Sequence, residues 1–428
     1  MGLKSGYKQT EVGVIPEDWL VSTVGTEFSI QLGKMLDAEK NVGVPKPFLG
    51  NRSVQWGRID LTDIGKIKLT SSDLQRFRLR EGDLLVCEGG EIGRSAIWHQ
   101  PIEECYFQKA LHRLRPIRSF DINLMHYTLQ RLAAVGFLLN FATQTSIAHL
   151  PKDKFETIPI PVPPAKAEQE AIAEALSDAD ALIESLEQLV AKKRHLKQGA
   201  MQELLTGKKR LPGFTAVGYK QTEIGELPID WKVRKIGDVA NVKTGPFGST
   251  LHERDYVSDG TPIITVEHLG ECGVLHVGLP MVSDSDKKRL KAYVIEEGDI
   301  VFSRVGSVDR NALVSKAESG WLFSGRLLRL RAASEDLDTR FMSYQFHSEP
   351  FKQRVITVAV GQTMASLNTQ ILNNVLIAVP PHPEQTAIAA VLSDMDADIA
   401  TLETKLTKAR QLKLGMMQEL LTGRIRLV

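Results

Sequence analysis

Cysteine is scarce in this chain of 428 residues: the three thiols are Cys87, Cys105 and Cys272. An odd, scattered set forms neither a disulfide framework nor a cysteine zinc site, so we expect buried thiols. Long apolar runs are also absent, because no stretch approaches the ~18–20 residues of a membrane span. The opening MGLKSGYKQTEVG contains no apolar signal core. The sequence therefore favours a cytoplasmic protein without membrane contact.

A surplus of one charge is missing as well. The chain has 53 Lys and Arg against 52 Asp and Glu, for a formal net charge of +1. Non-specific binding to phosphates depends on surplus Lys and Arg. Any DNA binding must therefore come from local basic faces, base-edge contacts or partner proteins.

Catalytic and cofactor motifs are lacking too. The segment Gly89-Gly90-Glu91-Ile92-Gly93 ends without the Gly-Lys-Ser/Thr of a phosphate loop and matches no Gly-x-Gly-x-x-Gly fingerprint. The Pro-Pro pairs at 163–164 and 380–381 lack the polar and aromatic neighbours of a methyltransferase Asn-Pro-Pro-Tyr loop. The ten histidines form no His-Glu-x-x-His cluster. We expect no catalytic residue, bound cofactor or metal site in this chain.

What the chain does contain is an internal repeat. Residues Glu168–Gly207 return as Glu384–Gly423, at a constant shift of 216 residues (384 − 168). The hexapeptide Met-Gln-Glu-Leu-Leu-Thr recurs letter for letter at 201–206 and 417–422. We expect these identical ends to be docking points for two identical partner subunits. The opening segment Tyr7–Trp19 also returns, as Tyr219–Trp231, so the repeat covers the whole chain.

This repeat predicts four parts. They are residues 1–165, a first recognition module with an N-terminal box; 166–210, a central long helix; 211–381, a second recognition module; and 382–428, a distal long helix.

The two repeated helices carry apolar residues at alternating steps of four and three, the spacing of a seam that packs against another helix. The series is Ile172, Leu176, Ala179, Ile183, Leu186 and Val190 in the first helix and Ile388, Leu392, Met395, Ile399, Leu402 and Leu406 in the second, and all but Ala179 and Met395 are taken as the seam residues. Each helix follows a Pro-Pro pair and ends at a glycine, Gly207 or Gly423. About 38 helical residues would span roughly 57 Å. We interpret the carboxylates Asp178, Asp180, Asp394 and Asp396 as solvated helix faces.

The globular regions match more weakly, at the same shift. Glu-Gly-Asp before an apolar run, at 81–83 and 297–299, predicts a turn into a buried strand. Alternating Leu and Arg at 111–115 and 327–331 predicts a strand with one buried and one wet face. Asp121 and Asp338 are expected to cap helices. Short strands at 158–162 and 375–379 lead into the prolines, so we predict an α+β module present twice.

The residues Ser22–Leu79 and Arg234–Ile295 align poorly, and this indicates two related but different ligands on one framework. Arg and Lys can read guanine, Gln and Asn adenine, and Glu the amino group of cytosine. The candidate DNA-binding residues are Arg52, Gln55, Arg58, Arg76, Arg78, Arg94, Lys109, Gln144, Thr145, His149, His252, Glu267, His268, Arg304, Arg310, Arg326, Gln362, Thr363 and Asn368.

Taken together, these features resemble the specificity subunit of type I restriction–modification systems. The motifs that carry the resemblance are Tyr-Lys-Gln-Thr-Glu-x-Gly followed by Pro-x-x-Trp at 7–19 and 219–231, Pro47-Phe48-Leu49 with Val54–Asp60, Gly260–Ile264, Glu-Gly-Asp, the Gln-Thr pairs at 144 and 362, and Pro-Pro before Glu-Gln-x-Ala-Ile. No single motif is specific, but the ordered set occurs twice and spans the chain.

The resemblance implies a non-catalytic subunit with two target-recognition domains that are separated by two long antiparallel paired helices. Each domain would read one half of a bipartite site in double-stranded DNA. Two methyltransferase subunits and motor–nuclease subunits would be the protein partners. S-adenosylmethionine, ATP and Mg²⁺ would belong to those partners, with no cofactor in this chain.

The physics of the helices agrees with that expectation. Antiparallel pairing would place the two modules at opposite ends, up to roughly 57 Å apart, which exceeds one DNA turn of about 34 Å. Two different modules on a two-fold frame predict a non-palindromic target. The spacer phosphates could be met by Lys192, Lys193, Arg194 and Lys197, and a solvated charge run is the alternative interpretation of these residues.

Two other functions stay open at this point. The first is a self-contained DNA methyltransferase or nuclease, which the missing cofactor motifs disfavour. The second is a scaffold that binds proteins through its helices and reads no DNA.

Overall fold

The computed structural model describes residues 5–37, 39, 41–143, 148–215, 218–246, 251–271, 273–334, 336–359 and 366–427. The chain divides into two compact units. Unit 1 comprises Met1–Glu187 and Lys405–Val428, and unit 2 comprises Gln188–Thr404. Each unit therefore combines one globular module with segments of both long helices.

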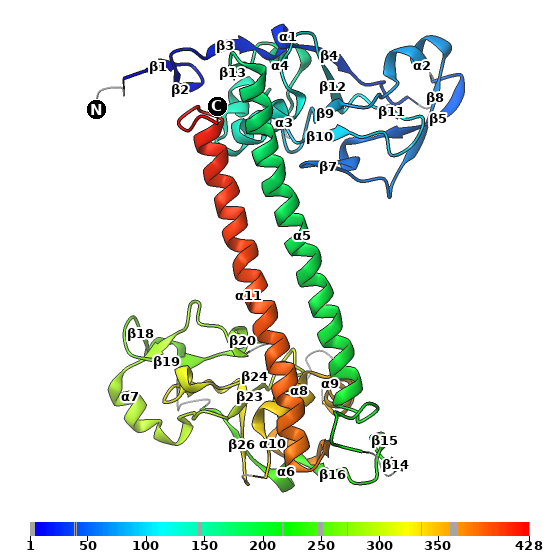
Figure 1. Ribbon diagram of the computed structural model, residues 1–428. Coiled ribbons are helices and arrows are strands. Elements are labelled where there is room, and N and C mark those ends of the chain that lie inside the picture. The colour runs from blue at the N-terminus through cyan, green and yellow to red at the C-terminus, as the bar shows by residue number, and fades with distance from the viewer. Residues whose placement is uncertain are drawn as a thin grey trace. The chain divides into compact units, whose positions relative to one another are not determined.

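The repeated helix prediction is confirmed by α5 (Lys166–Leu204) and α11 (His382–Leu420), each of 39 residues (Figure 1). Both helices begin just after a Pro-Pro pair. Both are followed by a glycine with positive φ, 69° at Gly207 and 66° at Gly423. A side chain at Gly207 would also collide with the ring of Pro228, 2.6 Å from the position of a Cβ. Glycine is required at this helix end by both conformation and space.

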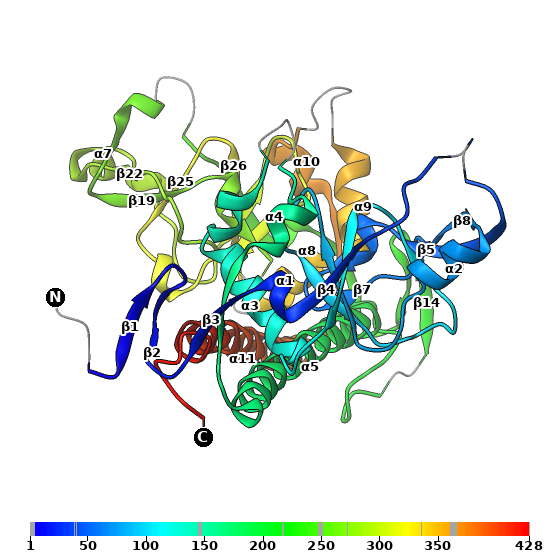
Figure 2. The ribbon, with the colours of Figure 1, turned by 90° about the horizontal axis from the view of Figure 1, so that it is seen from above.

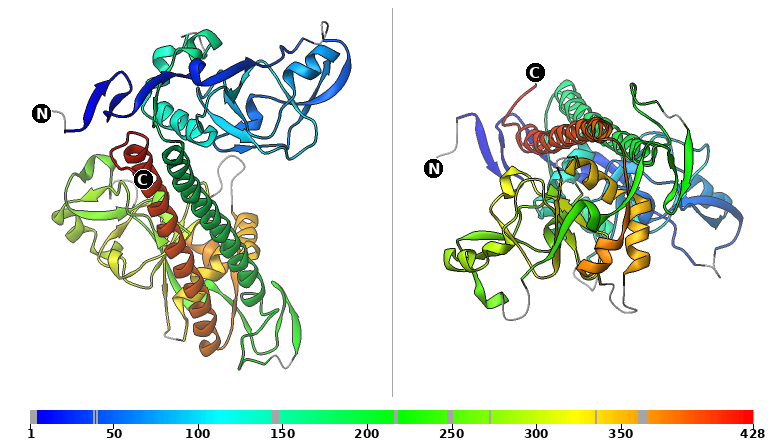
Figure 3. Two further views of the ribbon diagram at one scale, coloured as in Figure 1. Left: turned by 45° about the horizontal axis from the view of Figure 1, so that its top comes forward. Right: turned by 90° about the horizontal axis from the view of Figure 1, so that it is seen from below.

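Within each unit the two helix segments run antiparallel and are joined by ion pairs (Figure 3). In unit 1, Arg410 Nη2 lies 2.6 Å from Glu187 Oε1, and Lys413 Nζ lies 2.6 Å from Asp180 Oδ1. The equivalent pairs in unit 2 are Arg194–Glu403 and Lys197–Asp396, each at 2.5 Å. Lys193 pairs with Asp398 at 2.9 Å. Three of the four basic residues considered for spacer phosphates thus already have carboxylate partners.

The predicted seam residues are buried or half-buried along the two long helices. Ile172, Leu176, Val190, Ile388, Leu392 and Ile399 are at most 8% exposed, and Ile183, Leu186, Leu402 and Leu406 are half-buried. The leucines of the repeated hexapeptide, Leu204, Leu205, Leu420 and Leu421, are at most 5% exposed and belong to the cores of the units. The leucines are covered by their own unit, while Gln202, Glu203 and Gln418 of the same segments are exposed, so docking of two partner subunits at these ends stays a prediction.

The elements of the unit 1 module are β1 (Tyr7–Thr10), β2 (Gly13–Pro16), β3 (Leu20–Thr23), α1 (Val24–Glu27), β4 (Phe28–Leu32), β5 (Val44–Leu49), η1 (Asn51–Ser53), β6 (Val54–Gln55), β7 (Arg58–Ile59), β8 (Gly65–Leu69), α2 (Ser71–Phe77), β9 (Asp83–Cys87), β10 (Ser95–Trp98), β11 (Tyr106–Phe107), β12 (Leu111–Pro116), α3 (Ile122–Ala134), η2 (Phe137–Phe141), α4 (Lys152–Glu156) and β13 (Pro159–Val162).

The elements of the unit 2 module are β14 (Tyr219–Thr222), β15 (Gly225–Pro228), β16 (Lys232–Lys235), α6 (Ile236–Val239), β17 (Ala240–Thr244), η4 (Glu253–Asp255), β18 (Tyr256–Val257), β19 (Thr261–Ile264), η5 (Val266–His268), β20 (Leu269–Gly270), β21 (Gly273–Val274), β22 (Met281–Val282), α7 (Asp284–Arg289), η6 (Lys291–Tyr293), β23 (Ile300–Ser303), β24 (Asn311–Leu313), η7 (Lys316–Glu318), β25 (Leu322–Phe323), β26 (Leu327–Ala332), α8 (Thr339–His347), α9 (Glu349–Val358), α10 (Thr369–Asn374) and β27 (Leu376–Val379).

The two modules share their main sheet, while the second sheet has three strands in unit 1, β11-β5-β8, and four in unit 2, β18-β22-β19-β25. A four-stranded antiparallel sheet has the order β4-β12-β9-β10 in unit 1 and β17-β26-β23-β24 in unit 2. A second sheet contains one parallel pair in each module, β5 with β11 and β19 with β25. A hairpin opens each module, β1–β2 or β14–β15. The predicted α+β fold, present twice, is confirmed.

Several local predictions are confirmed. The Glu-Gly-Asp turns lead into β9 and β23, whose residues are all buried. Asp121 caps α3, because its Oδ1 accepts from the amides of residues 123 and 124. Asp338 caps α8 in the same way. Cys87 and Cys105 are buried thiols, while Cys272 lies outside the described residues.

The predicted wet face of the Leu-Arg strands is wrong at their centres. Arg113 on β12 is 8% exposed and Arg329 on β26 is 7% exposed. The Arg113 guanidinium donates to the carbonyls of Arg76 and Arg78, at 3.1 and 3.3 Å, and lies 5.4 Å from the centre of the Phe107 ring. Burial lowers the pKa of Arg113 to about 10. Carbonyl acceptors and an aromatic face replace water at this position.

The interpretation of the helix aspartates as solvated is wrong for Asp396, whose side chain is 19% exposed, whereas the side chain of Asp180 is 41% exposed. Tyr127 on α3 donates its hydroxyl to Asp180 at 3.0 Å, and Tyr344 on α8 donates to Asp396 at 2.7 Å. The same aspartates accept the lysine pairs described above. Each module is therefore tied to the helix pair by a Tyr–Asp–Lys contact, which fixes the orientation of the module on its unit.

In each unit, an arginine that follows one long helix binds a buried glutamate at the start of the other. We call this contact the clasp. Glu384 at the start of α11 is fully buried, and Arg210, which follows α5, binds it with Nη2 2.6 Å from Oε2. Arg210 also binds Asp230 at 3.0 and 2.8 Å, and the Trp231 indole donates to Glu384 at 3.0 Å. These hydrogen bonds, with that of Asp230 first, raise the pKa of the Arg210 guanidinium.

Unit 1 repeats this clasp with the chain terminus. Arg426 binds Glu168, which is fully buried, and Asp18. The guanidinium lies 5.8 Å from the ring of Trp19. Tyr7 of the opening hairpin donates to the carbonyl of Gly423 at 3.1 Å, and β1–β2 lies beside the end of α11 (Figure 2). The N-terminal box therefore packs on the helix end contributed by the last residues of the chain.

Breaking the clasp of unit 2 should destabilise that unit strongly. Replacing Arg210 by Met leaves the Glu384 carboxylate buried and without its cation, which costs roughly 3 kcal/mol or more of unfolding free energy. Chemical denaturation checks this value. Arg194→Met is the matched control, since it removes an exposed ion pair worth less than ~1 kcal/mol. Equal effects of the two variants would contradict the assigned role of the clasp.

Acid should also destabilise the protein through three histidines. Burial lowers the pKa of His112, His126 and His347 to about 4, whereas an unfolded histidine titrates near ~6.5. As pH falls from 6.5 to 4, these histidines therefore bind protons in the unfolded chain and stay unprotonated in the native state. The unfolding free energy should drop by up to ~1.4 kcal/mol per pH unit for each histidine. The pH slope of denaturation should lose one such contribution in His112→Gln, and an unchanged slope in that variant would refute this.

Candidate nucleic-acid interface

A short hairpin in each module carries the first group of predicted DNA contacts. In unit 1, β6 pairs with β7 through Val54↔Ile59 and Gln55↔Arg58, with η1 immediately before it. The side chains of Arg52 and Arg58 are exposed. Gln55 is half-buried and donates to the carbonyl of Arg52 at 2.8 Å.

Unit 2 has the equivalent hairpin, β20–β21, preceded by η5. Glu267 on η5 is exposed. His268 is 5% exposed, and its Nδ1 accepts from the backbone amide of Thr265 at 3.2 Å. Of these two candidates, the structure presents Glu267 at the surface and uses His268 to cap a turn.

Two candidate arginines hold these hairpins in place. Arg94 donates from Nη2 to the carbonyl of Asn51 at 3.0 Å, and its side chain is 16% exposed. Arg310, at the equivalent position of the repeat, donates from Nη2 to the carbonyl of Leu269 at 2.5 Å. Both arginines extend from the loop after the buried strand to the backbone that starts the hairpin. Their first role is therefore to position the hairpin.

The loop after the buried strand meets a second segment in each module. Gly89 forms an antiparallel bridge with His149, and Val305 forms one with Ser366. Residues Gln144, Thr145, Gln362 and Thr363, four of the predicted contacts, lie just before these bridges and outside the described residues. Their neighbour Asn368 is exposed and caps α10, since its Oδ1 accepts from the amide of Ile371 at 2.8 Å.

The remaining candidates fall into two sets. Lys109, His149 and Arg326 are exposed around the loop, and half-buried Arg304 donates to the carbonyl of Gly325 at 3.4 Å. Arg76, Arg78 and His252 lie on other elements: Arg76 in α2, Arg78 directly after it and His252 just before η4. Contact of any of these residues with DNA stays a prediction.

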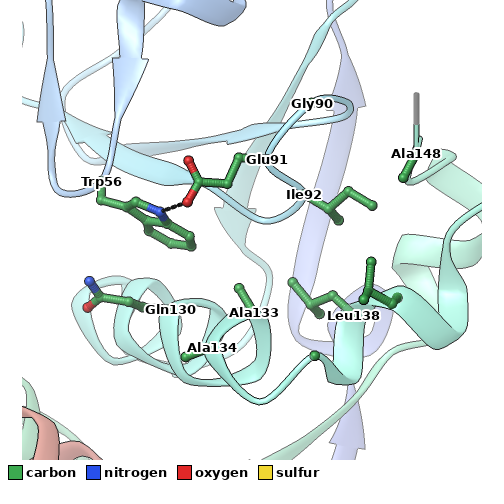
Figure 4. Close-up of a pocket in the computed structure, with 11 residues that line it drawn as sticks. Trp56, Gly90, Glu91, Ile92, Gln130, Ala133, Ala134, Leu138 and Ala148 are labelled. Atoms are coloured by element: carbon green, nitrogen blue, oxygen red, sulfur yellow. Dashed lines mark hydrogen bonds between the residues drawn. The ribbon is translucent and has the colours of Figure 1, made fainter. Parts of the chain in front are cut away.

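A pocket of ≈ 480 Å³ lies beside the unit 1 hairpin (Figure 4). It is lined by Trp56, Gly90, Glu91, Ile92, Gln130, Ala133, Ala134, Gly136, Leu138, Leu139 and Ala148. The Trp56 indole donates to Glu91 Oε1 at 2.6 Å. With an apolar floor and a carboxylate on its wall, this pocket does not suit a phosphate group. The glycine-rich segment 89–93 thus serves as a loop beside the hairpin, as its missing phosphate-loop residues indicate.

Among the described residues, no cluster of three or more His, Cys, Asp or Glu side chains is arranged to hold a metal ion. The same part of the chain contains no helix with the length and apolar character needed to cross a bilayer.

Comparisons with known proteins agree with this architecture. A family model described as "Type I restriction modification DNA specificity domain" matches the chain twice, over residues 16–192 and 228–411. The specificity subunit of the type I restriction enzyme MjaVIII from Methanocaldococcus jannaschii is 26% identical over 99% of this chain and 96% of its own length. The EcoKI specificity subunit of Escherichia coli is 24% identical over 93% of this chain and 86% of its own.

Solved structures show the same fold. The S subunit of a type I restriction–modification system from M. genitalium superposes with a TM-score of 0.60 at 16% identity, covering 98% of both chains. A second chain, from a study of complex assembly and conformational transition in a type I system, gives 0.56 at 16% identity over 96% of this chain and 99% of its own. The resemblance drawn from the sequence motifs is confirmed.

Removing one anchoring arginine should loosen one hairpin and leave the other intact. In Arg94→Gln the Asn51 carbonyl loses its guanidinium donor and keeps the weak one from the Cys87 thiol, so amide exchange over residues 54–59 should accelerate by about tenfold, corresponding to a hydrogen bond of ~1–2 kcal/mol. Arg310→Gln should act in the same way on residues 269–274 alone. Hydrogen–deuterium exchange read by mass spectrometry checks both variants, and each hairpin serves as the control for the other. Unchanged protection in both would show that the arginines do not position the hairpins.

Proposed function

The chain belongs to the type I restriction–modification DNA specificity family, and on this premise we propose that it is the DNA-specificity subunit of a type I restriction–modification complex. It reads a bipartite, asymmetric site in double-stranded DNA, with one half read by each module. It performs no chemistry itself and directs partner subunits to the site.

One observation carries this proposal: two modules built on the same four-stranded sheet present different side chains at equivalent places. The sheets, the anchoring arginines, the Tyr–Asp–Lys contacts and the clasps all recur. The hairpins and the segments between them differ in sequence. A repeated frame with varied surface residues suits two ligands of one chemical kind that differ in detail, as two short DNA sequences do.

The partners follow from the same premise. We propose that two methyltransferase subunits bind the repeated frame and that motor–nuclease subunits join them for restriction. S-adenosylmethionine, ATP and Mg²⁺ serve those partners. The nearly balanced charge of the chain fits this division of labour, because a subunit without surplus cations depends on its partners for general affinity to phosphates.

A footprint of the assembled complex tests the proposal. With its methyltransferase subunits, the chain should protect two half-sites about one helical turn apart, and the purified chain alone should bind the same duplex far more weakly. One continuous protected site, or no protection with the partner present, would contradict the proposal. Transfer of labelled methyl groups by the chain alone would instead support a self-contained methyltransferase. If the chain were a scaffold that reads no DNA, the complex would methylate the same DNA sites after residues 22–79 are exchanged for those of another module.

A further inference from the structure

One backbone position makes matching hydrogen bonds in the two modules. The amide of Glu88 donates to the carbonyl of Ala110 at 3.0 Å, and its carbonyl accepts from Leu150 at 2.7 Å. In unit 2 the amide of Arg304 donates to Arg326, and its carbonyl accepts from Leu367, both at 2.8 Å. The two residues stand 216 apart (304 − 88), the shift of the whole repeat. Glu88 and Arg304 therefore occupy the same place at the end of the buried strand.

The side chains at this place have opposite charge, and their neighbours differ in a complementary way. Glu88 has Lys109 and His149 within electrostatic range. At the equivalent positions around Arg304, the residues are Gly325 and Ser366. The module with the acid thus supplies two basic neighbours, and the module with the arginine supplies none at these two positions. The two modules therefore present an acceptor, Glu88, and a donor, Arg304, at the same position, while the backbone hydrogen bonds around it are the same.

The Glu88 carboxylate is available to accept a hydrogen bond from a ligand. Among the described residues, no side chain donates a hydrogen bond to it, although the residue is half-buried. Burial raises the pKa of this carboxyl, against the attraction of Lys109 and His149. Partial burial disfavours the charged carboxylate, and a donor on a bound ligand would compensate part of this cost. The adjoining Gly89 carbonyl accepts from Asn51 of the hairpin at 3.2 Å, so the loop that carries Glu88 is held against the predicted DNA-reading hairpin.

We propose that Glu88 and Arg304 are the paired specificity residues of the two modules, with opposite hydrogen-bonding polarity toward DNA. Resting on the proposed function, the inference assigns each residue one base. The Glu88 carboxylate accepts from an exocyclic amino group, that of cytosine N4 or adenine N6, in one half-site. The Arg304 guanidinium donates to O6 and N7 of guanine in the other. The assignment depends on the comparison of the two modules at this shared backbone position.

Selection from a randomised duplex pool by the assembled complex tests the assignment. The variants are Glu88→Gln and Arg304→Gln, in the full chain with its methyltransferase subunits. Glu88→Gln should relax base preference at one position of one half-site by roughly tenfold, since a directed base contact provides about 1–3 kcal/mol of discrimination. The other half-site should keep its preference. Arg304→Gln should do the reverse, with loss of preference for guanine at one position.

Matched controls are available in both modules. Glu81→Gln alters an exposed acid before the other end of strand β9, and Arg234→Gln alters an exposed arginine on β16. Both controls should select the wild-type motif, and thermal unfolding should show all four variants folded. Wild-type motifs from both Glu88→Gln and Arg304→Gln would overturn the assignment while leaving the proposed function intact. If the wild-type complex itself selects no split motif, the proposed function fails together with it.

Discussion

The structure depends on a carboxylate that is buried where each long helix begins. Glu168 and Glu384 are fully buried, and an unpaired charge in that place would cost several kcal/mol. The compensating cation comes from the residues that follow the other helix, Arg426 in unit 1 and Arg210 in unit 2. A module therefore cannot complete its unit with its own helix alone. This requirement couples the two helices, and through the tyrosines of α3 and α8 it also fixes how each module sits on its helix pair.

Above this frame, the modules separate positioning from reading. Arg94 and Arg310 bind backbone carbonyls of the hairpins and are the same residue in both modules. The neighbouring position, by contrast, holds Glu88 in one module and Arg304 in the other. Every residue type has a backbone carbonyl, so Arg94 and Arg310 can stay the same in both modules while the residues of the hairpins and of position 88 or 304 differ. A duplicated chain can in this way acquire two specificities without altering the contacts that hold it together.

Much of this could be predicted from the sequence, and the rest depends on contacts between distant residues. The long helices, their glycine ends, the caps Asp121 and Asp338 and the buried strands all follow from local patterns. Local patterns could not show that Arg113 and Arg329 are buried, since their acceptors are carbonyls elsewhere in the chain. For the same reason local patterns could not show that Asp396 is partly buried beneath Tyr344 and Lys197. Glu88 carries no local signal of a reading residue, and its significance appears when it is compared with Arg304 through their shared backbone bonds.

The central claim is that this chain alone selects which DNA sequence its complex recognises. Genome-wide mapping of methylated bases, in cells with and without the chain, tests this most directly. The account predicts one split motif of two unlike halves that is methylated when the chain is present and unmethylated when it is removed. A methylation pattern that is unchanged by removal of the chain, or a lost motif that is continuous and palindromic, would contradict it.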